Sequence, residues 1–157
     1  AARPAAAGSP AATGGGVQIA RAQSAQPSVG QQNPAVAVYQ QNGGSVVNIS
    51  TMVASFGQAG MAMYGASRAA LELLTKAWAA EYGPSGVRVN AVAPGPTRTA
   101  LMEAVPEEMV NQLAALAPAG RVARPEELAA AIVFLASDDA SFVHGVTLAV
   151  DGGRVAT

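Results

Sequence analysis

The chain has 157 residues, of which half are hydrophobic and only 4% aromatic, and its formal net charge is -1 at pH 7. This length fits one domain, and the low charge leaves no basic surface for nucleic acid. The chain has no cysteine, which excludes disulfide bonds, thiolate metal ligands and a cysteine nucleophile. No apolar run approaches the roughly 20 residues that span a bilayer. We therefore expect a cytoplasmic protein with no metal site and with neither nucleic acid nor membrane as a partner.

Residues 1–42 differ in composition from the rest of the chain, because they are rich in Ala, Gly, Pro, Gln and Ser and hold few large apolar residues. Such a segment buries too little apolar surface to offset the entropy lost when it becomes ordered. It also lacks the basic and apolar regions of a signal peptide. We predict that residues 1–42 are low-complexity and disordered, and that residues 43–157 form the folded domain.

The first folded element predicted is a buried strand at residues 45–50, where a β-branched apolar run follows two glycines. A helix then begins near Ala62 and ends before Gly83. Its expected buried face consists of residues at helical spacing, Leu71, Leu74, Trp78 and Tyr82. A second strand is predicted at residues 87–92, after which two prolines and a glycine at residues 94–96 require a loop.

Two more helices and a last strand follow. The helix after Pro106 carries Met109, Leu113 and Leu116 at helical spacing, and the helix after Pro125 carries Leu128, Ile132 and Leu135. Residues 146–150 read as the last strand, with a turn at residues 151–153. Strands that alternate with helices predict an α/β domain with a parallel sheet of about three strands and three helices.

Several short motifs occur in order between Gly43 and Gly153. They include Gly44-Ser-Val-Val-Asn-Ile-Ser50, Tyr64-Gly-Ala-Ser-Arg68, Val89-Asn-Ala-Val-Ala-Pro-Gly95, Pro118-Ala-Gly-Arg121, Pro125-Glu-Glu127, Phe134-Leu-Ala-Ser137 and Val150-Asp-Gly-Gly153. This ordered set resembles the C-terminal half of the short-chain dehydrogenase/reductase family. The resemblance implies a partial Rossmann-like, doubly wound sheet. The glycine-rich dinucleotide turn of the family's N-terminal half has no counterpart here, so we expect that half to be missing.

The resemblance also implies three catalytic residues. Tyr64 matches the family's acid/base tyrosine, Arg68 matches its lysine, and Thr51, thirteen positions before the tyrosine, matches its substrate-orienting serine. A free phenol ionises only near pH 10, roughly, so a tyrosine that exchanges a proton near neutrality benefits from a nearby cation. Residues at i and i+4 lie on the same helix face, which is where the motif puts the cation. Arginine keeps the positive charge but does not deprotonate, and threonine keeps a hydroxyl.

By the same resemblance, the cofactor is NAD or NADP, and the residues expected to contact it are Tyr64, Arg68, Pro94, Gly95, Thr97 and Thr99. The implied reaction interconverts an alcohol and a ketone, aldehyde or 3-oxoacyl group on a small-molecule substrate. The alternative is a catalytically inactive, truncated fragment of the family or an interaction module, because low-complexity sequence precedes the first strand. The strand at residues 45–50 would lack neighbours on one side, so we also expect a homo-oligomer or self-association through that edge.

Overall fold

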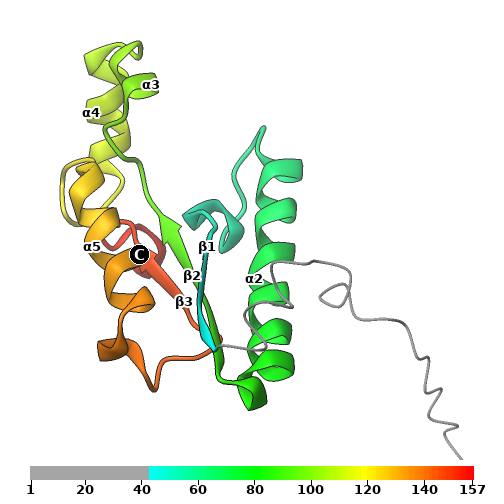
Figure 1. The fold of residues 1–157 in the computed structure, drawn as a ribbon. Coiled ribbons are helices and arrows are strands. Elements are labelled where there is room, and N and C mark those ends of the chain that lie inside the picture. Colours follow the sequence, from blue (N-terminus) through cyan, green and yellow to red (C-terminus); the bar gives the residue numbers. More distant parts are fainter. Residues whose placement is uncertain (1–42) are drawn as a thin grey trace, which may run out of the picture.

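The computed structural model describes residues 43–157, so the disorder predicted for residues 1–42 lies outside the described residues. Three parallel strands form one sheet in the order β1-β2-β3: β1 (Gly44–Ile49), β2 (Val87–Pro94) and β3 (Thr147–Val150). The α-helices are α2 (Ala62–Tyr82), α3 (Ala100–Glu103), α4 (Glu107–Ala115) and α5 (Pro125–Ala136) (Figure 1). Short 3-10 turns are η2 (Met52–Ala54), η3 (Gly83–Ser85), η4 (Asp138–Ala140) and η5 (Arg154–Ala156). The predicted Rossmann-like, doubly wound parallel sheet is confirmed.

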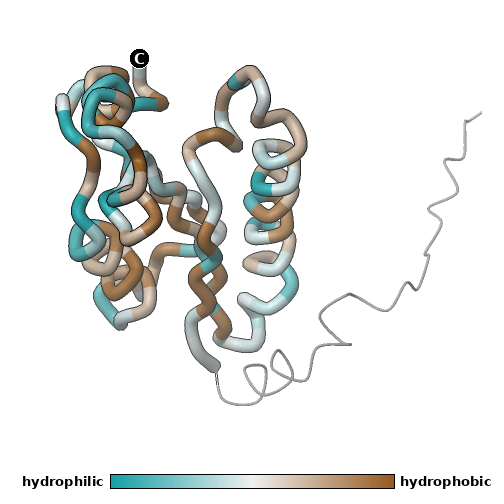
Figure 2. The backbone as a smooth tube through the Cα atoms, turned by 90° about the horizontal axis from the view of Figure 1, so that it is seen from above, coloured by the Kyte–Doolittle hydropathy of each residue, from teal (hydrophilic) through white to brown (hydrophobic). Residues whose placement is uncertain are grey.

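Helices α2 and α5 cover opposite faces of the sheet, because side chains alternate between the two faces along each strand. Val46 of β1 packs with Ala79 and Tyr82 of α2, whereas Val47 packs with Leu135 of α5. Figure 2 shows the hydrophobic strands enclosed between the two groups of helices. The connection from β1 to β2 runs through α2, and the connection from β2 to β3 runs through α5. Both connections move one strand along the sheet in the same direction, but their helices lie on opposite faces. The two crossover connections therefore have opposite handedness. Parallel crossovers are nearly always right-handed, which makes one of these connections the rare exception.

The buried face of α2 agrees in part with the predicted one. Tyr82 is buried and Trp78 packs against the core, as predicted, whereas Leu74 is 40% exposed and Thr75 and Ala79 are buried instead. The prediction followed the largest apolar side chains, but the helix approaches the sheet through smaller ones. The hydroxyl of Thr75 donates to the carbonyl of Leu71 at 2.8 Å and accepts from the side-chain amide of Asn48 in β1 at 2.9 Å. A small residue with both bonds made therefore faces the sheet, and Leu74 stays outside.

Helix α4 buries smaller side chains than the apolar residues noted at helical spacing. Val110 and Ala114 are buried, whereas Met109 and Leu116 are each 52% exposed. The four-residue helix α3 was not expected, so residues 43–157 contain four α-helices rather than about three. Figure 1 shows α3 and α4 projecting beyond the end of the sheet. Within residues 43–157, no helix combines the length and apolar character needed to cross a membrane.

Polar side chains of the central strand β2 tie it to its surroundings. The side chain of Asn90, which is fully buried, donates to the carbonyl of Val143 at 2.9 Å and accepts from the amide of Val146 at 3.1 Å. The guanidinium of Arg88 donates to the carbonyls of Leu135 and Ser137 at 2.8 and 2.9 Å. A cation at the carbonyl end of a helix is favourable, because it meets the negative end of the helix dipole. These contacts fix the end of α5 and the entry into β3.

Candidate active site

A hollow of about 520 Å³ opens at the carboxyl ends of β1 and β2. In open α/β sheets, ligands bind at this edge. All seven residues that the sequence predicted for catalysis or cofactor contact line the hollow: Thr51, Tyr64, Arg68, Pro94, Gly95, Thr97 and Thr99. Helix α5, which no pattern in the sequence placed at this site, adds Pro125, Leu128, Ala129 and Ile132 to the wall. The helical spacing of Leu128 and Ile132 signalled a buried face but not what that face would meet.

Thr51 offers a hydroxyl to the hollow from the end of β1. It is buried and caps η2, where its oxygen accepts a hydrogen bond from the amide of Val53 at 3.4 Å. Its hydroxyl hydrogen has no acceptor within residues 43–157 and can therefore donate to a substrate oxygen. The neighbouring Ser50 also lines the hollow, but its hydroxyl donates to Oε1 of Glu72 at 2.6 Å. Thr51, rather than Ser50, is thus the hydroxyl donor left for a ligand.

Tyr64 and Arg68 lie one helical turn apart near the start of α2. The Cζ atom of Arg68 lies 5.4 Å from the centre of the Tyr64 ring, which is a cation–π distance. The guanidinium also donates through Nη1 to the carbonyl of Ile49 at 3.0 Å. Tyr64 is 41% exposed, and its hydroxyl has no hydrogen-bond partner in the described part of the chain. The pair therefore presents one phenol and one cation to the hollow.

The turn after β2 requires glycine at position 95. The backbone amide of Gly95 donates to the carbonyl of Val150 at 3.0 Å, and a Cβ atom at Gly95 would lie only 2.7 Å from Cα of Asp151. Thr97 Oγ1 donates to the carbonyl of Gly95 at 3.0 Å, which closes the turn. The exposed Thr99 begins α3 without a capping hydrogen bond from its side chain. Its hydroxyl is thus free for a ligand.

The composition of the wall fits a nicotinamide ring. Apolar side chains of β2 and α5, including Val92 and Leu128, form one side, on which a flat ring can pack. Free hydroxyls of Thr51, Tyr64 and Thr99 provide the few polar groups that orient such a ligand. No group of three metal-binding side chains occurs within residues 43–157.

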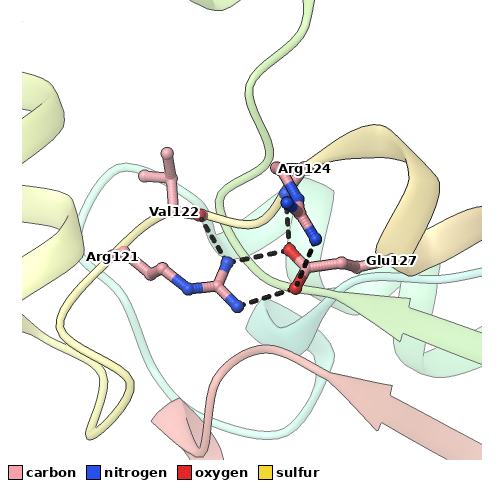
Figure 3. A network of polar contacts seen from close by, with 4 residues as sticks. All are labelled: Arg121, Val122, Arg124 and Glu127. Carbon is pink, nitrogen blue, oxygen red and sulfur yellow. Dashed lines mark hydrogen bonds and ion pairs between the residues drawn. The ribbon is translucent and has the colours of Figure 1, made fainter.

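A charged network holds the first turn of α5 beside the hollow (Figure 3). The guanidinium of Arg121 donates to both carboxylate oxygens of Glu127, at 2.8 and 2.6 Å, and the backbone amide of Arg124 donates to Oε2 at 2.8 Å. These bonds, led by that from Arg121, lower the pKa of Glu127 from 4.5 to about 2, and the same pairing raises the pKa of Arg121. The network fixes the start of the helix that walls the hollow.

Comparisons with known proteins agree with this architecture. The family model described as enoyl-(acyl carrier protein) reductase matches residues 22–154. The chain is 50% identical over 113 residues to a cis-4-hydroxycyclohexanecarboxylate dehydrogenase of Sinomonas cyclohexanicum, covering 72% of this chain and 45% of that protein. It is 44% identical over 115 residues to the 3-oxoacyl-(acyl-carrier-protein) reductase FabG of Thermotoga maritima, covering 73% of this chain and 47% of that protein.

A solved structure is also similar. The gluconate 5-dehydrogenase of Burkholderia cenocepacia, crystallised with NADP and tartrate, superposes with a TM-score of 0.72 at 34% identity. The match covers 78% of this chain and 50% of that protein. The chain thus spans about half the length of the curated relatives it matches. On the family match, the identities and the fold together, the chain belongs to the short-chain dehydrogenase/reductase family.

Proposed function

We propose that this chain carries the catalytic side of an NAD(P)-dependent oxidoreductase that interconverts an alcohol and a ketone, an aldehyde or a 3-oxoacyl group. The observation that carries the proposal is that all seven predicted site residues line one hollow at the carboxyl ends of the parallel strands. The names of the relatives, which are dehydrogenases and reductases, support the same reaction class. The substrate is a small molecule with a hydroxyl or carbonyl group.

In this proposal, three side chains act on the reacting oxygen. Thr51 donates its free hydroxyl hydrogen to the oxygen and holds it in place. Tyr64 donates a proton to a carbonyl oxygen during reduction and takes the proton from the alcohol during oxidation. Arg68 supplies a permanent positive charge beside Tyr64, and its other donors can bind the ribose hydroxyls of the cofactor. When bound, the nicotinamide supplies or accepts the hydride.

The turn after β2 holds the cofactor in this proposal. Pro94 and Gly95 bring the backbone close to the hollow, and the hydroxyl of Thr99 is available for the nicotinamide amide or a phosphate oxygen. Thr97 keeps the turn in shape through its hydrogen bond to the Gly95 carbonyl. The cofactor is NAD or NADP.

Nicotinamide absorbance tests the proposal directly. The chain is incubated with NAD or NADP, oxidised or reduced, and a panel of secondary alcohols and ketones. The Tyr64→Phe variant should reduce kcat by about 10²- to 10⁴-fold, the usual contribution of a positioned acid/base group. Arg68→Lys and Thr51→Ser, which restore the residues the family uses, should retain or raise turnover. If the folded wild type shows no turnover that depends on Tyr64, the proposal is wrong.

A non-catalytic interaction module is the second candidate. It is favoured by the presence of Arg68 and Thr51 at the two positions where the family uses lysine and serine. The Thr51→Ser/Arg68→Lys double variant separates the candidates. If that variant folds but, like the wild type, turns over no substrate, the module is the better description.

We further propose that copies of the chain associate through the outer edge of β1. Within residues 43–157 no strand pairs with this edge, and the apolar Ile49 at its end, which also lines the hollow, is 44% exposed. An open edge presents unpaired backbone groups to another strand. Light scattering should show a dimer or larger species, and Ile49→Lys should shift it towards monomer. A wild-type monomer at all concentrations would contradict the proposal.

A further inference from the structure

The chain ends in a short turn whose shape is fixed by a buried carboxylate. Asp151, which is buried after β3, accepts hydrogen bonds from the backbone amides of Gly153 and Val155 at 2.9 and 2.8 Å. These bonds fold the residues after β3 into η5 and determine where Arg154 leaves the backbone. Because the strands are parallel, η5 lies at the same edge of the sheet as the ends of β1 and β2 (Figure 1).

The turn η5 contacts two segments that lead into the hollow, while Arg154 and Phe56 themselves lie outside its lining. On one side, Asp151 packs directly against Gly95 of the turn after β2. On the other side, Cζ of Arg154 lies 4.9 Å from the ring centre of Phe56. Phe56 belongs to the loop that leads from Thr51 to Tyr64. Arg154 therefore sits beside the loop that joins the proposed substrate donor to the proposed acid/base residue.

The guanidinium of Arg154 makes no hydrogen bond or ion pair within residues 43–157. The guanidinium of every other arginine within residues 43–157 forms a hydrogen bond or an ion pair with a carboxylate or a backbone carbonyl; these are Arg68, Arg88, Arg98, Arg121 and Arg124. Arg154 has no such partner among the described residues, and its Nε atom is buried without an acceptor. A buried donor without an acceptor is unfavourable, and a ring face satisfies only the charge. Because this Nε atom is closed to solvent, the donors left for an anion from outside the chain are the two terminal nitrogens of Arg154, which make no hydrogen bond within residues 43–157.

We propose that Arg154, supported by the ring of Phe56, binds a carboxylate group of the substrate. The inference rests on the proposed function, because it names the substrate class of the same site. The planar fork of a guanidinium matches the two oxygens of a carboxylate, and the aromatic ring beneath fixes the orientation of that fork. The substrate is then a hydroxy acid or an oxo acid, with the reacting oxygen at Thr51 and Tyr64 and the carboxylate at Arg154.

Ligand binding tests this inference without requiring turnover. Isothermal titration calorimetry measures the affinity of the full 157-residue chain for benzoate and for benzamide, two molecules of the same shape that differ in charge. Benzoate should bind more tightly than benzamide, and Arg154→Met should weaken benzoate binding by about tenfold or more, as for a lost hydrogen bond to a charged group. Benzamide binding should not change. Arg98→Met is the matched control, because it removes an equal charge from an exposed arginine that is paired with Glu107.

Two milder variants keep the test decisive if Arg154→Met does not fold. Arg154→Lys keeps the charge but loses the fork, and Phe56→Leu keeps apolar bulk but loses the ring face, so each should weaken benzoate binding less than Arg154→Met. The inference is overturned if benzoate binds no better than benzamide, or if all folded Arg154 and Phe56 variants bind benzoate like the wild type. Benzoate binding that depends on Arg154, without turnover that depends on Tyr64, would leave carboxylate recognition standing and refute only the proposed reaction.

Discussion

Replacing Gly95 with alanine tests how closely the turn after β2 packs against the end of β3. The new Cβ atom would lie 2.7 Å from Cα and 3.0 Å from Cβ of Asp151. Neither atom is the end of a flexible side chain, so the backbone must move. Overpacking of this kind costs about 1–3 kcal/mol, and the stiffer unfolded chain recovers about 0.4–1 kcal/mol. We expect a net loss of about 1–2 kcal/mol in the free energy of unfolding.

Urea denaturation followed by circular dichroism measures this loss as a shift of the midpoint at constant m-value. Gly57→Ala is the matched control, because no atom lies within 4 Å of a Cβ at that position. We expect the control to match the wild type or to be slightly more stable. Equal midpoints for the two variants would refute the idea that contact between Gly95 and Asp151 shapes this turn.

Three further variants test the core and the start of α5. Asn90→Ala leaves the amide of Val146 without its acceptor and opens a cavity at a fully buried position, and it should lower the free energy of unfolding by about 2–4 kcal/mol in urea titrations. Leu135→Ala, at a fully buried position, should cost about 2–5 kcal/mol by the same assay. Glu127→Gln should lower the melting temperature near neutral pH, because it removes the charge that Arg121 binds.

Each of these variants has a result that would contradict its reasoning. Leu101, which is 84% exposed, provides the core control, and a Leu101→Ala variant as unstable as Leu135→Ala would be inconsistent with the burial described. A urea midpoint of Asn90→Ala equal to that of the wild type would mean that the two hydrogen bonds of the Asn90 side chain do not stabilise the fold. For Glu127 the folded-state pKa is lowered from 4.5 to about 2, so its stabilisation is complete above about 4.5 and disappears as pH falls through about 2. A difference in melting temperature between the wild type and Glu127→Gln that persists below about pH 2 would contradict this reasoning.

Local spacing and chain order made much of the candidate site predictable. Tyr64 and Arg68 are one helical turn apart, so their proximity needed only the helix. Pro94 and Gly95 directly follow an apolar strand, and in a parallel sheet strand ends share one edge. The sequence therefore located the hollow before any packing was known.

The parts that depend on packing between distant segments were not predictable. The periodicity of α2 marked Leu74 as buried, but the choice of face depends on how closely the helix approaches β2, and the smaller Thr75 and Ala79 allow the closer approach. The contact between Phe56 and Arg154 joins residues at opposite ends of the described domain, so no local pattern signals it. Side-chain pairs of this kind appear only when the sheet is assembled.

The strand pairings are unequal, and this affects how the domain opens. Six residue pairs join β1 to β2, whereas four join β2 to β3. Partial unfolding proceeds through the least protected unit, so backbone amides of β3 should exchange with solvent before those of β2. Opening of β3 carries η5 with it and separates Arg154 from Phe56, while Thr51 and Tyr64 stay on β1 and α2. Mild heating or low denaturant should therefore abolish the preference for benzoate over benzamide first. The arrangement of Thr51 and Tyr64 should be lost only at higher temperature or denaturant concentration.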